Sequence, residues 1–124
     1  MQWKFSGGSP VYVQIMEHMR MAILAGQFPP GARIPPVRDL AVQAGVNPNT
    51  MQRAMMELER ENILIACGTV GRFVTNDTQV LETLRKTAID AMIRSTAEQL
   101  RSLGLELSEA AALLLALEKE ETHE

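Results

Sequence analysis

The stretch GVNPNTMQR carries short polar side chains where a helix is expected to begin. Asn47 is a favourable N-cap residue, and Pro48 suits the first helical position, where its missing N–H group is no loss. Asn49, Thr50 and Arg53 place further hydrogen-bond donors and acceptors on the first two turns. Such groups can bond the polar edges of a ligand, and a helix N-terminus also favours a phosphate. The alternative is that Asn47 and Pro48 only cap a helix.

Three helices with an apolar face are predicted around this stretch, because apolar residues recur there at spacings of three and four. The first is capped by Ser9 and ends at Gly26, the second covers residues 36–44, and the third covers residues 47–62. A short strand is expected at Arg33 and Ile34. The segments 63–66 and 73–75 then predict a β-hairpin with glycines beside its turn.

Two short helices joined by a glycine-containing turn are typical of a helix-turn-helix motif. In that motif the N-terminal residues of the second helix face base edges in the major groove of DNA. Arg53 is the best candidate for a base contact, because a guanidinium group can donate two hydrogen bonds to guanine. The following hairpin would be the wing of a winged helix, and the residues expected at its tip are Gly68, Thr69, Gly71 and Arg72.

The region from about residue 9 to 75 resembles the DNA-binding domain of the GntR family of bacterial transcription regulators. The motifs that carry the resemblance occur in the family's order: SPVY, PPGARIP, VRDLA, GVNPNT, ELERE and GTVGRFV. The resemblance implies a winged helix-turn-helix domain over residues 1–76. It also implies DNA contacts, which fall on Arg33 and Arg38 beside the motif's first helix, on Asn49, Thr50 and Arg53 in the recognition helix, and on the wing glycines Gly68 and Gly71.

Two departures from the family pattern weaken the expected contacts. Pro36 stands where a serine is common, so a hydroxyl group that could cap the helix or touch a phosphate is missing. Ile65, Ala66 and Cys67 occupy wing positions that are often basic, which leaves Arg72 as the wing's cation. A small contribution of the wing to affinity is therefore expected.

The back half, residues 77–124, is expected to be a helical dimerisation domain. A long helix capped by Thr78 runs to Leu103, Gly104 ends it, and Ser108 caps a last helix. About 48 residues are too few for the ligand-binding domains of the larger subfamilies, so the chain resembles the short YtrA-type subfamily. The apolar stripe predicted to form a dimer comprises Leu81, Leu84, Ala88, Met92, Leu113 and Leu117. The alternative is a monomer whose last helices fold back on the winged domain.

Charge and composition narrow the function classes. The net charge is -3, but residues 1–76 hold seven Lys/Arg against five Asp/Glu, whereas residues 77–124 hold five against ten. No membrane span or secretory signal is apparent, and a single cysteine suits a reducing cytosol, so a cytoplasmic protein is expected. His18 and His123 have no catalytic partners nearby, so we predict no enzyme activity, no cofactor and no metal. Cys67 is expected to be an ordinary wing residue, with redox sensing as the alternative.

These observations predict an α+β, mostly helical fold: a winged helix-turn-helix followed by a two-helix dimerisation domain. The expected function is a homodimeric repressor that binds double-stranded DNA at a pseudo-palindromic operator. The resemblance further implies control of a transporter operon in response to a small molecule of unknown identity. The negative net charge and the weakly charged wing support one alternative, a winged-helix protein-interaction module without specific DNA binding.

Overall fold

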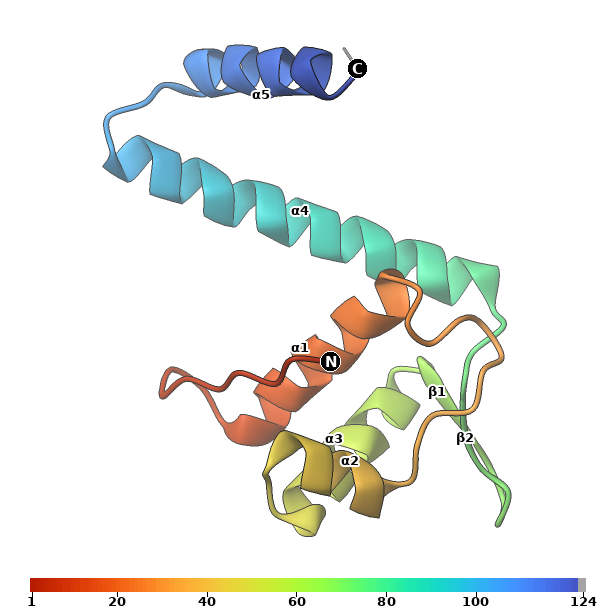
Figure 1. Cartoon of the computed structure of the whole chain (residues 1–124). Helices are drawn as coiled ribbons and strands as arrows, with labels where there is room; N and C mark the ends of the chain where they lie inside the picture. The colour runs from red at the N-terminus through yellow and green to blue at the C-terminus, as the bar shows by residue number, and fades with distance from the viewer. Residues whose placement is uncertain (123–124) are drawn as a thin grey trace. The chain divides into compact units, whose positions relative to one another are not determined.

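A computed structural model describes residues 1–122 of the 124-residue chain; His123 and Glu124 lie outside the described residues. Its elements run in the order α1 (Val11–Leu24), α2 (Val37–Ala44), α3 (Pro48–Arg60), β1 (Leu64–Cys67), β2 (Gly71–Val74), α4 (Thr78–Ser102) and α5 (Leu107–Glu121) (Figure 1). The predicted α+β, mostly helical fold is confirmed. The chain divides into two compact units, Met1–Arg85 and Lys86–Glu124, so the division falls inside α4, nine residues after the expected boundary at 76/77.

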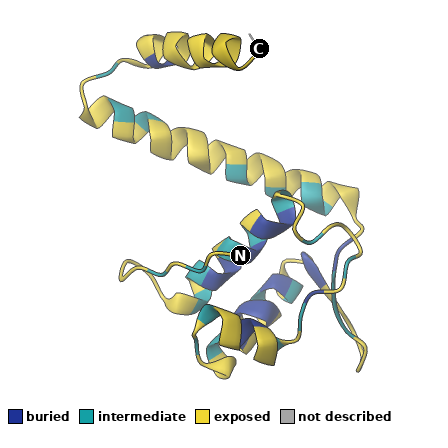
Figure 2. Ribbon diagram, in the orientation of Figure 1, coloured by how far each residue is buried: buried dark blue, intermediate teal, exposed yellow. Residues whose placement is uncertain are grey.

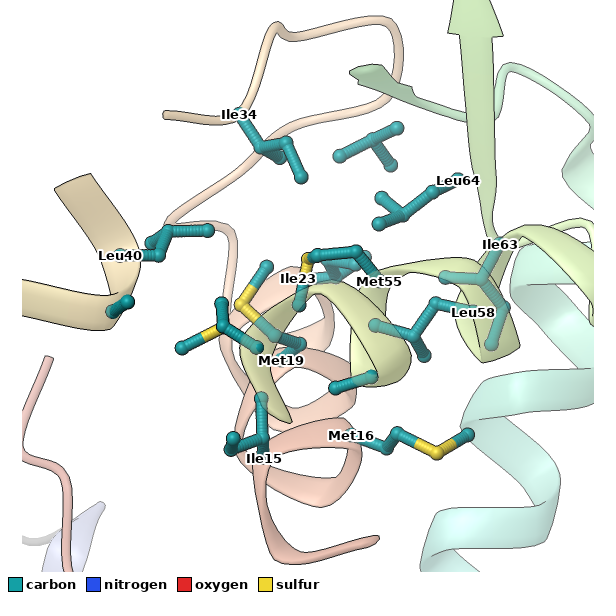
Figure 3. Packing of buried hydrophobic residues seen from close by; sticks show 14 residues of the cluster. Ile15, Met16, Met19, Ile23, Ile34, Leu40, Met55, Leu58, Ile63 and Leu64 are labelled. Carbon is teal, nitrogen blue, oxygen red and sulfur yellow. The ribbon is translucent and has the colours of Figure 1, made fainter. Parts of the chain in front are cut away.

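The first unit is organised around α3, which packs against α1, α2 and β1. Side chains from these elements, from the loop before α2 and from the turn after α3 point into one interior: Ile15, Met16, Met19, Ile23, Ile34, Leu40, Met55, Leu58, Ile63 and Leu64 (Figure 3). Of the positions that periodicity predicts to face inward, Tyr12 and Val46 are half-buried, and the others are buried: Ile15, Met16, Met19, Ala22 and Ile23 on α1, and Met51, Ala54, Met55 and Leu58 on α3. Methionines supply much of this interior, because their unbranched side chains fill irregular gaps that aromatic rings would fill elsewhere.

The wing is a two-stranded antiparallel hairpin in which Leu64 pairs with Val74 and Cys67 pairs with Gly71. A third segment lies along β2. Arg33 bridges Phe73, the N–H of Ile34 donates to the carbonyl of Arg72 at 3.0 Å, and the N–H of Val74 donates to the carbonyl of Ala32 at 2.9 Å. The predicted short strand at Arg33 and Ile34 is therefore a single bridge, and it ties the loop before α2 to the wing.

Glycine and asparagine end the helices of the motif. Gly45 ends α2 with φ of 69°, and the N–H of Val46 donates back to Ala41. Asn62 takes the corresponding position after α3 with φ of 62°, a left-handed conformation that asparagine tolerates better than most residues. Both turns leave the following residue buried or half-buried against the core.

Three predicted caps were wrong, while the cap at Asn47 is confirmed by its bond to the N–H of Asn49. Pro10, not Ser9, precedes α1, and its carbonyl accepts the first helical bonds without any side-chain cap. Asp77, not Thr78, caps α4, because its Oδ1 accepts from the N–H groups of Gln79 and Val80. Glu106, not Ser108, is the N-cap residue of α5 and makes no side-chain cap. The cap of α1 therefore lies one residue later than the hydroxyl side chain suggested, whereas those of α4 and α5 lie one and two residues earlier.

The N-terminal arm is docked by an aromatic cluster. The rings of Trp3 and Phe5 stack 6.2 Å apart, and His18 of α1 lies within 5.5 Å of both ring centroids. His18 Nε2 is 2.8 Å from the carbonyl of Lys4, and Gln14 exchanges two hydrogen bonds of 2.8 Å with the backbone of Ser6. These contacts dock the arm on α1, and the ring of His18 is used in this packing.

The second unit exposes most of its apolar side chains. No residue of α4 is buried, and burial in α5 is limited to Ala110 (Figure 2). The α4 helix ends shortly before Gly104, and the N–H of Leu105 donates to the carbonyl of Leu100. Between residues 1 and 122 no helix combines the length and the apolar character that crossing a bilayer would require.

The core of the first unit provides a matched stability test on α3. Met55 is fully buried, whereas the adjacent Met56 is 42% exposed. Met55→Ala is expected to lower the free energy of unfolding by about 2–5 kcal/mol through lost transfer energy and a residual cavity. Met56→Ala should change it by less than about 0.5 kcal/mol. Urea denaturation of both variants at one protein concentration measures the difference, and equal losses would contradict this packing.

Candidate nucleic-acid interface

The start of α3 forms a polar, exposed tip. Gly45 allows the sharp turn out of α2, and Asn47 Oδ1 accepts from the N–H of Asn49 at 2.7 Å. Met51 is fully buried behind the tip, which fixes the rotation of the helix and leaves Asn47 and Asn49 exposed and Thr50 half-buried. Because the oxygen of Asn47 is used in the cap, the group it retains for a ligand is the NH₂ donor.

Arg53 lies one turn beyond Asn49 on α3 and is held by an aromatic ring. Its guanidinium carbon is 3.8 Å from the ring centroid of Tyr12, which comes from α1. At this distance the ring face attracts the cation. Sequence reasoning missed Tyr12 as a partner because the spacing of α1 placed it on the apolar face. The half-buried ring serves both the core and the recognition helix.

Glutamates neutralise some arginines of the winged part and leave others free. Arg20 is bound by Glu17 and Glu61, Arg60 by Glu57, and Arg72 by Glu59. Among the arginines of residues 1–77, all of which the structure describes, Arg33, Arg38 and Arg53 make no ion pair. These three are also the arginines that the sequence assigned to DNA outside the wing. The unpaired positive charge therefore gathers on the predicted DNA-binding residues, although the whole chain is acidic.

An open groove of about 490 Å³ lies between the start of α2, α3 and the wing. The predicted wing residues Gly68, Thr69, Gly71 and Arg72 all line it, and so does Arg33. Gly71 has φ of 136°, and a Cβ at this position would lie 2.9 Å from Arg33 Nε. The absence of a side chain at Gly71 therefore lets Arg33 cross the wing beside its turn. Arg38 lies apart from the groove lining, exposed on α2.

Arg72 differs from the other predicted contacts, because its side chain turns toward α3. It forms an ion pair with Glu59, and its Nη1 lies 3.5 Å from Gln52 Oε1. Its side chain is only 20% exposed. No local pattern predicts this pair, since Glu59 lies on α3 and Arg72 lies on β2.

The predicted dimerisation stripe is divided between two environments. Leu81 and Leu84 pack against the core of the first unit. Ala88 is half-buried, while Met92, Leu113 and Leu117 are 50–62% exposed. The second unit exposes further large apolar side chains that the prediction did not include: Ile89, Ile93, Leu103, Leu107, Leu114 and Leu115.

Other candidate chemistry is sparse in the described part of the chain. Cys67 is a free, exposed cysteine at the end of β1. Residues 1–122 contain no group of His, Cys, Asp and Glu side chains that could hold a metal ion.

Comparison with known proteins gives consistent matches. The family model described as "Bacterial regulatory proteins, gntR family" matches residues 11–74. The HTH-type transcriptional repressor YtrA of Bacillus subtilis (strain 168) is 32% identical over 116 residues, covering 94% of this chain and 81% of the relative. A GntR family transcriptional regulator from Listeria monocytogenes has 28% identity and a TM-score of 0.80, with coverage of 90% of this chain and 98% of the other. AraR(DBD) in complex with an operator has 28% identity and a TM-score of 0.56, covering 60% and 96%.

Variants of the two asparagines at the start of α3 distinguish a capping residue from an exposed residue that is free to contact a ligand. Asn47→Ala removes the cap of α3 and is expected to lower the free energy of unfolding by about 1 kcal/mol. Asn49→Ala, two residues away and exposed, should change it by less than about 0.5 kcal/mol. Thermal unfolding of the two variants compares them directly. A larger loss for Asn49→Ala would show that the cap is misassigned.

Proposed function

The chain belongs to the gntR family of bacterial regulatory proteins, and from this we propose that it is a homodimeric repressor that binds a pseudo-palindromic operator. Regulation of transcription through DNA binding is the function of this family, whose members are regulators and not enzymes. The observation that carries the finer proposal is that an exposed polar helix tip occurs in a winged part whose unpaired arginines are Arg33, Arg38 and Arg53. Blocking of a promoter is inferred because the similar YtrA of Bacillus subtilis is named a repressor.

The tip of α3 enters the major groove in this proposal. Arg53 reads a guanine edge, with Tyr12 steering its guanidinium, and Asn49 and Thr50 reach neighbouring bases or phosphates. Asn47 contributes its free NH₂ group. Short side chains at this tip let the backbone approach the groove closely.

Phosphate contacts fall beside the tip. Arg33 and Arg38 are free of protein carboxylates and can bind phosphates on either side of the groove. At the wing, Gly68, Thr69 and Gly71 present little bulk, so a sugar–phosphate strand can lie against the groove of about 490 Å³. Binding is therefore expected to weaken steeply with salt.

The exposed apolar side chains of the second unit support the homodimer. Met92, Ile93, Leu113, Leu114 and Leu117 are each at least half exposed in a single chain. Water contact with so many large apolar groups is unfavourable, and a second copy of the same helices is the partner that a two-fold operator requires. The dimer would present two α3 tips to half-sites roughly 34 Å apart. Such a regulator acts in the cytoplasm, where the bacterial chromosome lies. Control of a transporter operon and a small-molecule effector stay predictions of the resemblance.

Base reading by Arg53 is tested by recovery of bound genomic fragments. Wild-type protein should enrich specific sites, and Arg53→Ala should lose them while keeping weak, salt-sensitive binding. The expected loss is about 1–3 kcal/mol of discrimination against the wrong base. Arg60→Ala is the matched control, because Arg60 lies on the same helix but is bound by Glu57.

Two outcomes would contradict this assignment. Unchanged enrichment by Arg53→Ala would remove the base contact, and equal losses in Arg60→Ala would indicate a general charge effect. A wild-type chain that enriches no fragments at all would instead favour a protein-interaction module.

The dimer is tested by sedimentation equilibrium at micromolar concentration. Wild-type protein should be a dimer, and Leu113→Asp together with Leu117→Asp should give a monomer, because charges on that face would have to be buried. Val42→Asp is the control, since Val42 is 78% exposed but belongs to α2. A monomeric wild-type protein would rule out this assembly.

A further inference from the structure

We propose that Arg72 is a positioning residue, which neutralises Glu59 and fastens the wing to the recognition helix instead of binding a phosphate itself. This inference rests on the proposed function, because it concerns how the winged helix meets DNA. It assigns to Arg72 and Glu59 a role that motif matching does not provide, since the sequence pattern predicts Arg72 as the cation at the tip of the wing.

The side chain of Arg72 spans two turns of α3. Its guanidinium group donates to Glu59 and approaches Gln52 Oε1 at 3.5 Å. Gln52 and Glu59 are seven residues apart, which places them on one face of the helix. The side chains of Arg72 and Glu59 are 20% and 27% exposed. The ion pair is thus partly shielded from water, unlike the pairs on open helix surfaces.

The backbone of Arg72 is fixed by the loop before α2. The carbonyl of Arg72 accepts from the N–H of Ile34 at 3.0 Å. The side chain of Arg33, which precedes Ile34, crosses Gly71, which precedes Arg72. Arg72 therefore joins three parts: the loop before α2, the wing, and α3. A rigid joint here fixes the distance between the wing and the helix that enters the major groove.

The charge of Glu59 gives the joint a second consequence. Glu59 lines the groove in which a phosphate strand is proposed to lie. An unpaired carboxylate there would repel phosphate, whereas the ion pair with Arg72 cancels its charge. The charged groups lining the groove are Arg33, Glu59 and Arg72, so Arg33 is left as the net positive charge. A direct phosphate contact by Arg72 would uncover Glu59 at the same place.

A charge swap distinguishes the two roles. Arg72→Glu, Glu59→Arg and the double variant are compared in the full chain, using fluorescence anisotropy with a random-sequence duplex. Arg72→Glu alone should bind about tenfold more weakly, because two carboxylates then face the phosphate strand. The double swap restores the pair and should return the Kd to within about threefold of wild type.

The free protein provides a readout that a phosphate contact would not change. Hydrogen exchange of the wing amides should accelerate in Arg72→Glu and return to the wild-type rate in the double swap, because the pair holds the wing on α3. Arg60→Glu is the matched control. This variant makes the same charge change in the Arg60–Glu57 ion pair, which lies on α3 but does not line the groove. Hydrogen exchange of the wing amides should therefore be unchanged, and the Kd should rise by less than about threefold.

The outcomes separate this inference from the proposed function. A double swap that binds as weakly as Arg72→Glu, or wing exchange that Arg72→Glu leaves unchanged, overturns the positioning role while DNA binding stands. A wild-type chain that binds no duplex even at low salt overturns the proposed function and the DNA role of this pair with it.

Discussion

The burial of one face of α3 is the constraint on which the remaining structure depends. Met51, Ala54, Met55 and Leu58 are all buried without measurable exposure, between α1, α2 and β1. Their burial fixes the rotation of the helix about its axis. The opposite face, with Asn49, Gln52 and Arg53, is then presented to solvent at a fixed angle. A recognition helix needs this rigidity, because hydrogen bonds to base edges tolerate little rotation.

Local ion pairs allow a chain with a negative net charge to bind DNA. The glutamates of α3 and its C-terminal turn lie beside Arg60, Arg72 and Arg20, which consume their charge locally. Net charge describes long-range attraction or repulsion, but a groove-binding surface responds to charges within about one Debye length, roughly 8 Å. Arg53, one turn from the tip of α3, therefore keeps its full positive charge there, and Arg33 and Arg38 keep theirs beside the wing and on α2. The acidic surplus lies entirely in residues 77–124, which hold ten Asp/Glu against five Lys/Arg.

The sequence predicted elements well and side-chain partnerships poorly. Helical periodicity located the buried faces of α1 and α3, and Asn47–Pro48 located the start of α3, because these signals are local. The cap of α4 was misassigned since Asp77 and Thr78 are adjacent and both can cap. Tyr12 with Arg53, and Glu59 with Arg72, could not be predicted, because each pair joins different elements. The packing of Leu81 and Leu84 was missed for the same reason, since a helical stripe does not identify which surface covers it.

The close approach of Arg33 to Gly71 has an evolutionary consequence. Any side chain at position 71 would occupy the space through which the guanidinium group passes, and the positive φ already disfavours other residues there. Substitutions at the two positions are thus not independent: a larger residue at 71 is compatible only with a shorter or redirected one at 33. Among descendants of this chain, the loop before α2 and the wing should diverge together, so a change in one part alters which phosphates the other can reach.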